Sequence, residues 1–122
     1  MKYKVLALLV LMSSHSLAAH LEAPLSSCHV AEQRVLADQT GGNVTDVGQA
    51  HIAARADVLI EDINSLRMSR KISKAAADKM TQRVKEIRLQ GDKFVAQQGF
   101  LSAGEKASFD REFDGMAGRI CN

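Results

Sequence analysis

Apolar residues recur every three or four positions over much of the chain, and this spacing constrains the fold more than any other feature. One stripe follows a single helix face and consists of Ile52, Ala56, Leu59, Ile60, Ile63 and Leu66. A second stripe alternates three- and four-residue steps and consists of Ala77, Met80, Val84, Ile87, Gly91, Phe94 and Gln98. That rhythm is typical of antiparallel helices that pack at shallow angles. Gly91 lowers helix propensity, so we expect another backbone to approach closely there.

Turn and capping residues separate the predicted helices. Residues 67–71 end the first helix, and Ser73 is placed to cap the second. Residues 98–100 end the second helix, and Ser102 with Glu105 forms a capping box for the last helix. The inward residues of that helix are predicted to be Phe109, Phe113, Met116, Ala117 and Ile120. No segment is predicted to be a strand.

The sequence therefore predicts an all-α protein of one small domain. Residues 49–122 are expected to form a small antiparallel three-helix bundle. Residues 19–48 are expected to be an N-terminal segment that ends in a Gly-rich loop. Within this segment, Ser26 or Ser27 could cap a short helix that runs to about residue 37.

Residues 1–18 have the features of a secretory signal peptide. Lys2 and Lys4 precede an unbroken run of eight apolar residues, and a polar, small-residue region follows. A helix needs about 20 residues to cross a bilayer core, so this run is too short to span it. Cleavage after Ala18 fits the small-residue pattern of signal-peptide cleavage sites, and cleavage after Ala19 is the alternative. We expect a periplasmic or secreted protein without a membrane span.

Cys28 and Cys121 both remain after this processing. In an oxidising compartment an even pair predicts a disulfide. Closing a loop of this length stabilises a fold by roughly 4–5 kcal/mol on the chain-entropy model. The alternative is a lipoprotein, because residues 25–28 satisfy a lipobox and Cys28 would then be acylated.

Charge is distributed unevenly along the chain. The 16 Lys and Arg residues exceed the 14 Asp and Glu residues only by the two signal-segment lysines, so we expect no nucleic-acid binding. Residues 67–93 nevertheless carry nine basic side chains against three acidic ones. We expect an electropositive face centred on Arg67, Arg70, Lys71 and Lys74 that binds another protein with an acidic surface, or an anionic envelope polymer. Alternatively, this is a basic helix beside acidic ones, with exposed pairs that contribute little.

No arrangement of residues in the sequence predicts catalysis, so neither a catalytic residue nor a cofactor is assigned. His20 and His29 lie near the processed terminus, and a copper site built on them remains an alternative. His51 flanks the first apolar stripe and is interpreted as a surface residue, and Asp62 lies away from the centre of that stripe.

Three charged residues, Lys106, Asp110 and Asp114, follow one face of the last predicted helix at four-residue spacing. Two carboxylates so placed could hold a cation or share a proton. Solvated surface charges are the commoner arrangement, and we interpret them so.

Two turn-to-helix starts carry a resemblance to a known family. Residues 72–76 (Ile-Ser-Lys-Ala-Ala) and 101–105 (Leu-Ser-Ala-Gly-Glu) resemble the LTxxQ-type repeats of small periplasmic helical chaperones of the Spy/CpxP class. Ser stands in place of Thr in both, and Ala76 and Glu105 stand in place of Gln. The resemblance implies a non-enzymatic envelope-stress protein that holds unfolded clients on an amphipathic surface.

Together these patterns favour an exported, non-enzymatic helical binding protein of the cell envelope, present as a monomer or homodimer. Its expected role is chaperone-like or that of an accessory protein that binds other proteins. Two alternatives remain: an inhibitor or immunity protein that neutralises an envelope-targeted toxin, and a periplasmic copper binder.

Overall fold

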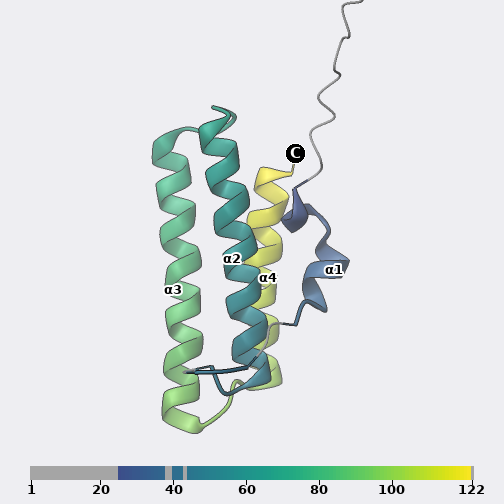
Figure 1. The fold of residues 1–122 in the computed structure, drawn as a ribbon, viewed down its shortest axis with the longest axis vertical. Coiled ribbons are helices and arrows are strands. Elements are labelled where there is room, and N and C mark those ends of the chain that lie inside the picture. Colours follow the sequence, from purple (N-terminus) through teal and green to yellow (C-terminus); the bar gives the residue numbers. More distant parts are fainter. Residues whose placement is uncertain (1–24, 38–39, 43, 122) are drawn as a thin grey trace, which may run out of the picture.

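The structure, a computed structural model, describes residues 25–37, 40–42 and 44–121 (Figure 1). Its elements are the 3₁₀ helix η1 (Ser26–Cys28) and the α-helices α1 (Val30–Arg34), α2 (Val47–Met68), α3 (Lys74–Gln98) and α4 (Ala103–Ile120). These residues contain no strand, which confirms the all-α prediction. The predicted signal segment 1–18, the cleavage sites at Ala18 and Ala19, and His20 lie outside the described residues.

The three long helices run side by side, and α2 packs against both others (Figure 1). Contacts between α3 and α4 are much fewer than those that either helix makes with α2. η1 packs on α2 and α4, and α1 packs on α4, so this segment lies on the opposite side of α2 from α3 (Figure 1). The N-terminal segment therefore adds to the α2–α4 side of the fold.

Each long helix begins at a capping side chain. Asp46, Ser73 and Ser102 each accept a hydrogen bond from the backbone N–H three residues later. The Glu105 carboxylate accepts from the Ser102 N–H and completes the predicted capping box. α3 ends at Gly99, whose φ of 87° is left-handed and terminates the helix. The predicted caps at Ser73 and Ser102 are confirmed.

The core is formed by the predicted apolar stripes of all three long helices. Its members include Ile52, Ala56, Leu59, Ile63, Leu66, Ala77, Val84, Ile87, Phe109, Phe113, Met116 and Ile120. Gln98 was expected in the seam and is exposed. The expected backbone approach at Gly91 is wrong: a Cβ there would meet the side chains of Phe109 and Ile52 at 3.9 and 4.0 Å, which is ordinary contact.

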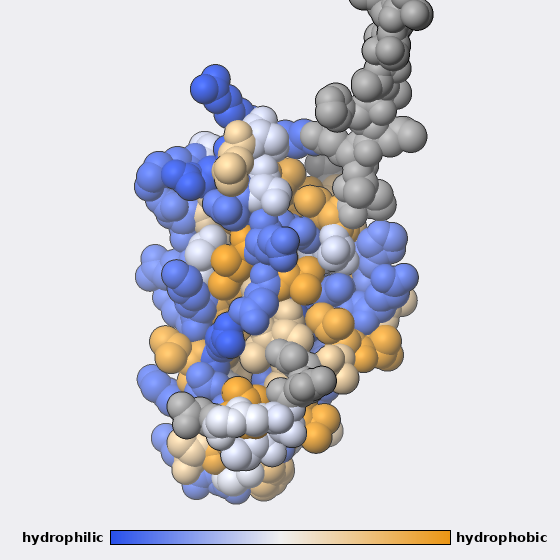
Figure 2. Space-filling model, viewed as in Figure 1, coloured by the Kyte–Doolittle hydropathy of each residue, from blue (hydrophilic) through white to orange (hydrophobic). Residues whose placement is uncertain are grey.

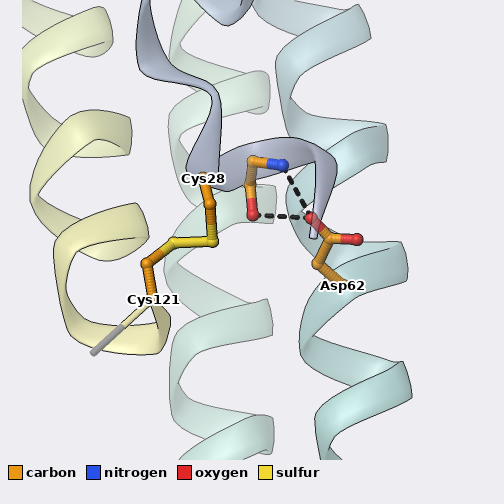
Figure 3. The surroundings of a disulfide bond; sticks show 4 residues. Cys28, Asp62 and Cys121 are labelled. Atoms are coloured by element: carbon orange, nitrogen blue, oxygen red, sulfur yellow. Dashed lines mark hydrogen bonds between the residues drawn. A yellow bond between two sulfur atoms is a disulfide. The ribbon is translucent and has the colours of Figure 1, made fainter. Parts of the chain in front are cut away.

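A disulfide joins Cys28 to Cys121, with 5.7 Å between their Cα atoms, and confirms the predicted pairing (Figure 3). Beside it, the Ser27 N–H and Oγ donate to Asp62 Oδ2 at 2.8 and 2.6 Å. Asp62 is therefore buried, which its position away from the apolar stripe did not predict. The bond leaves Cys28 joined to Cys121 rather than to the lipid of the alternative hypothesis.

The short N-terminal helix is smaller than predicted. It ends at Arg34 instead of about residue 37, and no side chain caps its first turn. Neither Ser26 nor Ser27 is that cap, because the N-cap position of α1 is His29.

Candidate functional site

The four predicted binding residues meet where α2 is joined to α3. Arg67 lies in the last turn of α2, Arg70 and Lys71 follow it, and Lys74 is the first residue of α3. All four are exposed, and with Met68 they line an open depression of about 620 Å³. We call these five residues the basic turn. The structure thus places the residues predicted from charge around one surface feature.

Hydrogen bonds fix the backbone of the basic turn. The Ser69 hydroxyl donates to the carbonyl oxygens of Ser65 and Leu66 at 3.0 and 3.2 Å. The Lys71 N–H donates to the Leu66 carbonyl at 2.9 Å. Arg70 has a φ of 60°, in the left-handed region that few residues other than glycine adopt. Arg70 and Lys71 therefore project from a loop whose backbone is fixed.

The charges of the basic turn are only partly neutralised. Lys74 pairs with Asp78 one turn along α3, and this hydrogen bond lowers the pKa of the Asp78 carboxyl. Arg70 forms no ion pair with any carboxylate of the described residues. Met68 is 74% exposed beside these cations. Cations beside an exposed thioether suit a partner that combines acidic and apolar groups.

Outside the basic turn, the large apolar side chains of the described residues that are exposed are Val35, Val47, Leu89 and Phe100. Leu89 lies on α3, and Val47 begins α2. A hydrogen bond from the Leu101 N–H to Asp46 Oδ2 at 3.3 Å brings the start of α2 to the loop that contains Phe100. The face in Figure 2 shows hydrophilic side chains over much of α3 and at the end where α3 joins α2, with smaller hydrophobic groups between them.

A second group of charges is buried between α2 and α4. Arg55, only 1% exposed, donates to Asp110 Oδ1 at 2.8 Å and to Asp114 Oδ1 at 2.9 Å. Its guanidinium carbon lies 5.5 Å from the ring centre of Phe113. Lys106 Nζ donates to Asp110 Oδ2 at 3.0 Å. We call His51, Arg55, Lys106, Asp110 and Asp114 the buried charge cluster.

His51 joins this cluster to the N-terminal segment. Its Nε2 lies 2.7 Å from Asp110 Oδ1, and its Nδ1 lies 2.5 Å from the Leu36 carbonyl oxygen. Both partners are hydrogen-bond acceptors, so each nitrogen of the ring faces an oxygen atom. The interpretation of His51 as a surface residue is wrong, because the segment that contains Leu36 covers it.

The Asp110 carboxylate is held in its ionised form. Burial by itself would raise the pKa of Asp110, but hydrogen bonds from His51, Arg55 and Lys106 outweigh it and hold the pKa well below its usual range. Arg34 pairs with Asp114 at 2.7 Å at the edge of the cluster. Asp110 is thus not the solvated charge that we expected, and each carboxylate in the cluster has cationic partners. This arrangement stabilises helix packing and presents no unpartnered carboxylate for acid–base chemistry.

Sequence reasoning missed Arg55, although its position carried a signal. It lies three residues after Ile52 and four before Leu59, on the face of the first apolar stripe. A cation at such a position requires a buried anion. Asp110 and Asp114, four residues apart on one face of the last helix, were the candidates.

No group of three or more His, Cys, Asp or Glu side chains within residues 25–37, 40–42 and 44–121 is arranged to hold a metal ion. His29 is exposed just before α1, and its proposed copper partner His20 is not among these residues. Of the helices in this part of the chain, none combines the length and apolar character needed to cross a membrane.

Comparison of the chain with protein-family models, curated proteins and solved structures finds no match. The resemblance of residues 72–76 and 101–105 to the Spy/CpxP class therefore remains a prediction.

Proposed function

We propose that this protein is an exported, non-enzymatic binding protein of the cell envelope that binds an acidic partner protein through the basic turn. The observation that carries this proposal is the gathering of Arg67, Arg70, Lys71 and Lys74 around one open depression with exposed Met68. Complementary charge speeds the encounter with an acidic surface and fixes the orientation of the complex. The disulfide supports export, because disulfides persist in oxidising compartments.

The rest of the fold would serve as a support for this surface. We regard α2, α3 and α4 as an antiparallel three-helix bundle, with the basic turn at one end. The buried charge cluster and the disulfide attach the N-terminal segment to the side of α2 away from α3. Recognition of a defined partner suits this design better than general holding of unfolded clients, because the basic turn exposes four cations and a single thioether.

Charge reversal at the basic turn tests the proposal. The Arg70→Glu/Lys74→Glu variant should lose a stoichiometric partner that the wild-type protein retains from an envelope extract at low salt. The Lys85→Glu/Lys93→Glu variant is the matched control, because it makes the same charge change elsewhere on exposed α3 positions. Equal capture by both variants, or capture that does not weaken with added salt, would contradict the role of the basic turn.

A second candidate function, inhibition of an envelope-targeted toxin, is favoured by the fixed backbone of the basic turn. The hydrogen bonds of Ser69 and Lys71 hold the loop before any partner arrives, and such preorganisation raises affinity. An inhibitor should form one tight complex of fixed stoichiometry in native mass spectrometry. A chaperone should instead suppress the aggregation of several unrelated clients.

A further inference from the structure

A groove runs between α3 and α4 on a part of the surface that the basic turn does not use. It exists because both helices pack against α2 but contact each other little. Its volume is about 540 Å³, within the range of small-molecule sites. Ala76 and Met80 line it from α3, and Met116 and Arg119 from α4.

Most of the exposed surface of the groove is apolar, and the other side chains that line it, all from α3, are Lys79, Gln82, Arg83 and Glu86. Met116, 2% exposed, belongs to the core, and the half-buried Met80 packs against it. Methionine side chains adapt their shape to apolar ligands because they are unbranched and polarisable. Ala76 also lines the groove, and a larger side chain at this position of α3 would fill it. Along α3, Ala76 and Arg83 are about 10 Å apart at the helical rise, a length that suits a medium-length alkyl chain.

Cationic side chains of the groove differ in their partners. Arg83 is bonded to Glu112 at 2.6 Å and to Glu86 at 3.3 Å, so its charge is neutralised. Lys79 and Arg119, by contrast, form no ion pair with a carboxylate of the described residues. Arg119 Nε donates to the Gly115 carbonyl at 3.4 Å, and within the part of the chain that the structure describes neither terminal nitrogen of the guanidinium has a bonded partner. The groove thus combines a mostly apolar surface with two cations that have no ion-pair partner among the described residues.

From this combination we infer that the α3–α4 groove binds a small amphipathic carboxylate, such as a free medium-chain fatty acid. The alkyl chain lies against Met80 and Met116, and the carboxylate binds Arg119 and Lys79. A guanidinium matches the two oxygens of a carboxylate in a planar, bidentate contact. This site is separate from the basic turn and does not depend on the partner proposed for it.

Binding of monomeric dodecanoate, followed by the methyl resonances of ¹³C-methyl-methionine, tests the inference. The signals of Met80 and Met116 should shift in a saturable manner, whereas that of Met68, exposed at the basic turn, should not. Dodecanol should bind at least about tenfold more weakly than dodecanoate, because it cannot form charge-assisted bonds to Arg119. Equal binding of the alcohol, or equal shifts at Met68, would overturn the inference.

Two variants and one control locate the site. Ala76→Phe fills the groove from an exposed position and should abolish binding, and Arg119→Gln should weaken it about tenfold. Lys85→Gln removes an α3 charge outside the groove lining and should leave binding unchanged. Circular dichroism and thermal unfolding verify that each variant is folded. Unchanged binding by folded Ala76→Phe or Arg119→Gln would refute the site.

A lipid bilayer presents related chemistry, so a further arm separates the two sources. Sedimentation with phosphatidylglycerol vesicles should leave the protein in the supernatant at concentrations at which dodecanoate shifts Met80 and Met116. Sedimentation with vesicles in the absence of any dodecanoate effect would overturn the inference in favour of a membrane surface.

Discussion

The two sides of α2 are held to their neighbours by different means. Towards α4, the contact contains the buried charge cluster, in which Arg55 is 1% exposed. Towards α3, the contact is mainly apolar, with one hydrogen bond from Gln49 Nε2 to Asp92 Oδ1 at 2.8 Å. An ion pair at its edge joins Arg88 to Asp57 at 2.6 Å with side chains 39% and 60% exposed. The same chemistry, an arginine with an aspartate, therefore occurs in two environments. Breaking a buried pair costs about 3–5 kcal/mol, whereas an exposed pair is worth about 0–1 kcal/mol.

The largest effect on stability is expected from loss of the disulfide, which lies on the α4 side of α2. Replacing both cysteines, Cys28→Ser/Cys121→Ser, should lower the free energy of unfolding by roughly 4–5 kcal/mol on the chain-entropy model, since the bridge spans 93 residues. Urea unfolding measures the loss, and reduction of the wild-type protein should reproduce it. A double variant as stable as the oxidised wild type would show that the bridge contributes little.

Breaking the buried charge cluster should cost nearly as much. Arg55→Met keeps an unbranched side chain but removes the cation that Asp110 and Asp114 share, so we expect a loss of about 3–5 kcal/mol in urea unfolding. A domain of this size has about 5–15 kcal/mol of stability, so the variant should remain measurable. A loss below about 1 kcal/mol would mean that the cluster behaves as a surface pair.

Acid should weaken the α4 side in particular. The folded-state pKa of Asp110 is lower than its unfolded value, so its stabilising effect is complete above the unfolded pKa of about 4 and is lost as the pH falls through the folded pKa. The free energy of unfolding should therefore decline as the pH falls below about 4. The Asp110→Asn variant should show a shallower decline, and Asp57→Asn at the exposed pair is the control. Identical pH profiles for these two variants would contradict the assignment.

A smaller effect, this time a gain in stability, is expected from a substitution in α3. Gly91→Ala adds a methyl group that meets Phe109 and Ile52 only at ordinary contact distance. Because alanine favours the helix by about 1 kcal/mol over glycine, the variant should be more stable by up to that amount. Destabilisation in urea unfolding would mean that the helix seam is tighter than these distances indicate.

The smallest effect completes the comparison. Arg88→Met is the matched substitution to Arg55→Met and should change the free energy of unfolding by less than about 1 kcal/mol, because water screens the exposed pair. Added salt should reduce even this difference. A loss equal to that of Arg55→Met would remove the contrast between the two sides of α2.

Much of the fold follows from local patterns. Apolar spacing predicted the three long helices, side chains at Ser73 and Ser102 predicted two of their starts, and the cysteine count predicted the disulfide. The helices and their caps depend on residues that are close in sequence, and two cysteines can form only one intramolecular disulfide. The basic turn was also visible, since its four cations lie within eight residues.

The buried charge cluster could not be assembled in the same way. His51 contacts Asp110 across 59 residues and Leu36 across 15. Its burial depends on how the N-terminal segment crosses the helices, which no periodicity encodes. The groove between α3 and α4 could not be predicted from the sequence for a related reason. It depends on the distance between these two helices where both pack against α2.

The bond between Cys28 and Cys121 makes the chain from residue 28 to residue 121 a covalent ring. A single proteolytic cut at any peptide bond within that ring opens it without releasing a fragment. The two pieces stay attached, and the helices on either side of the cut remain able to reassociate. An exposed loop such as that at Gly99 and Phe100 can therefore be nicked without dissociation of the molecule.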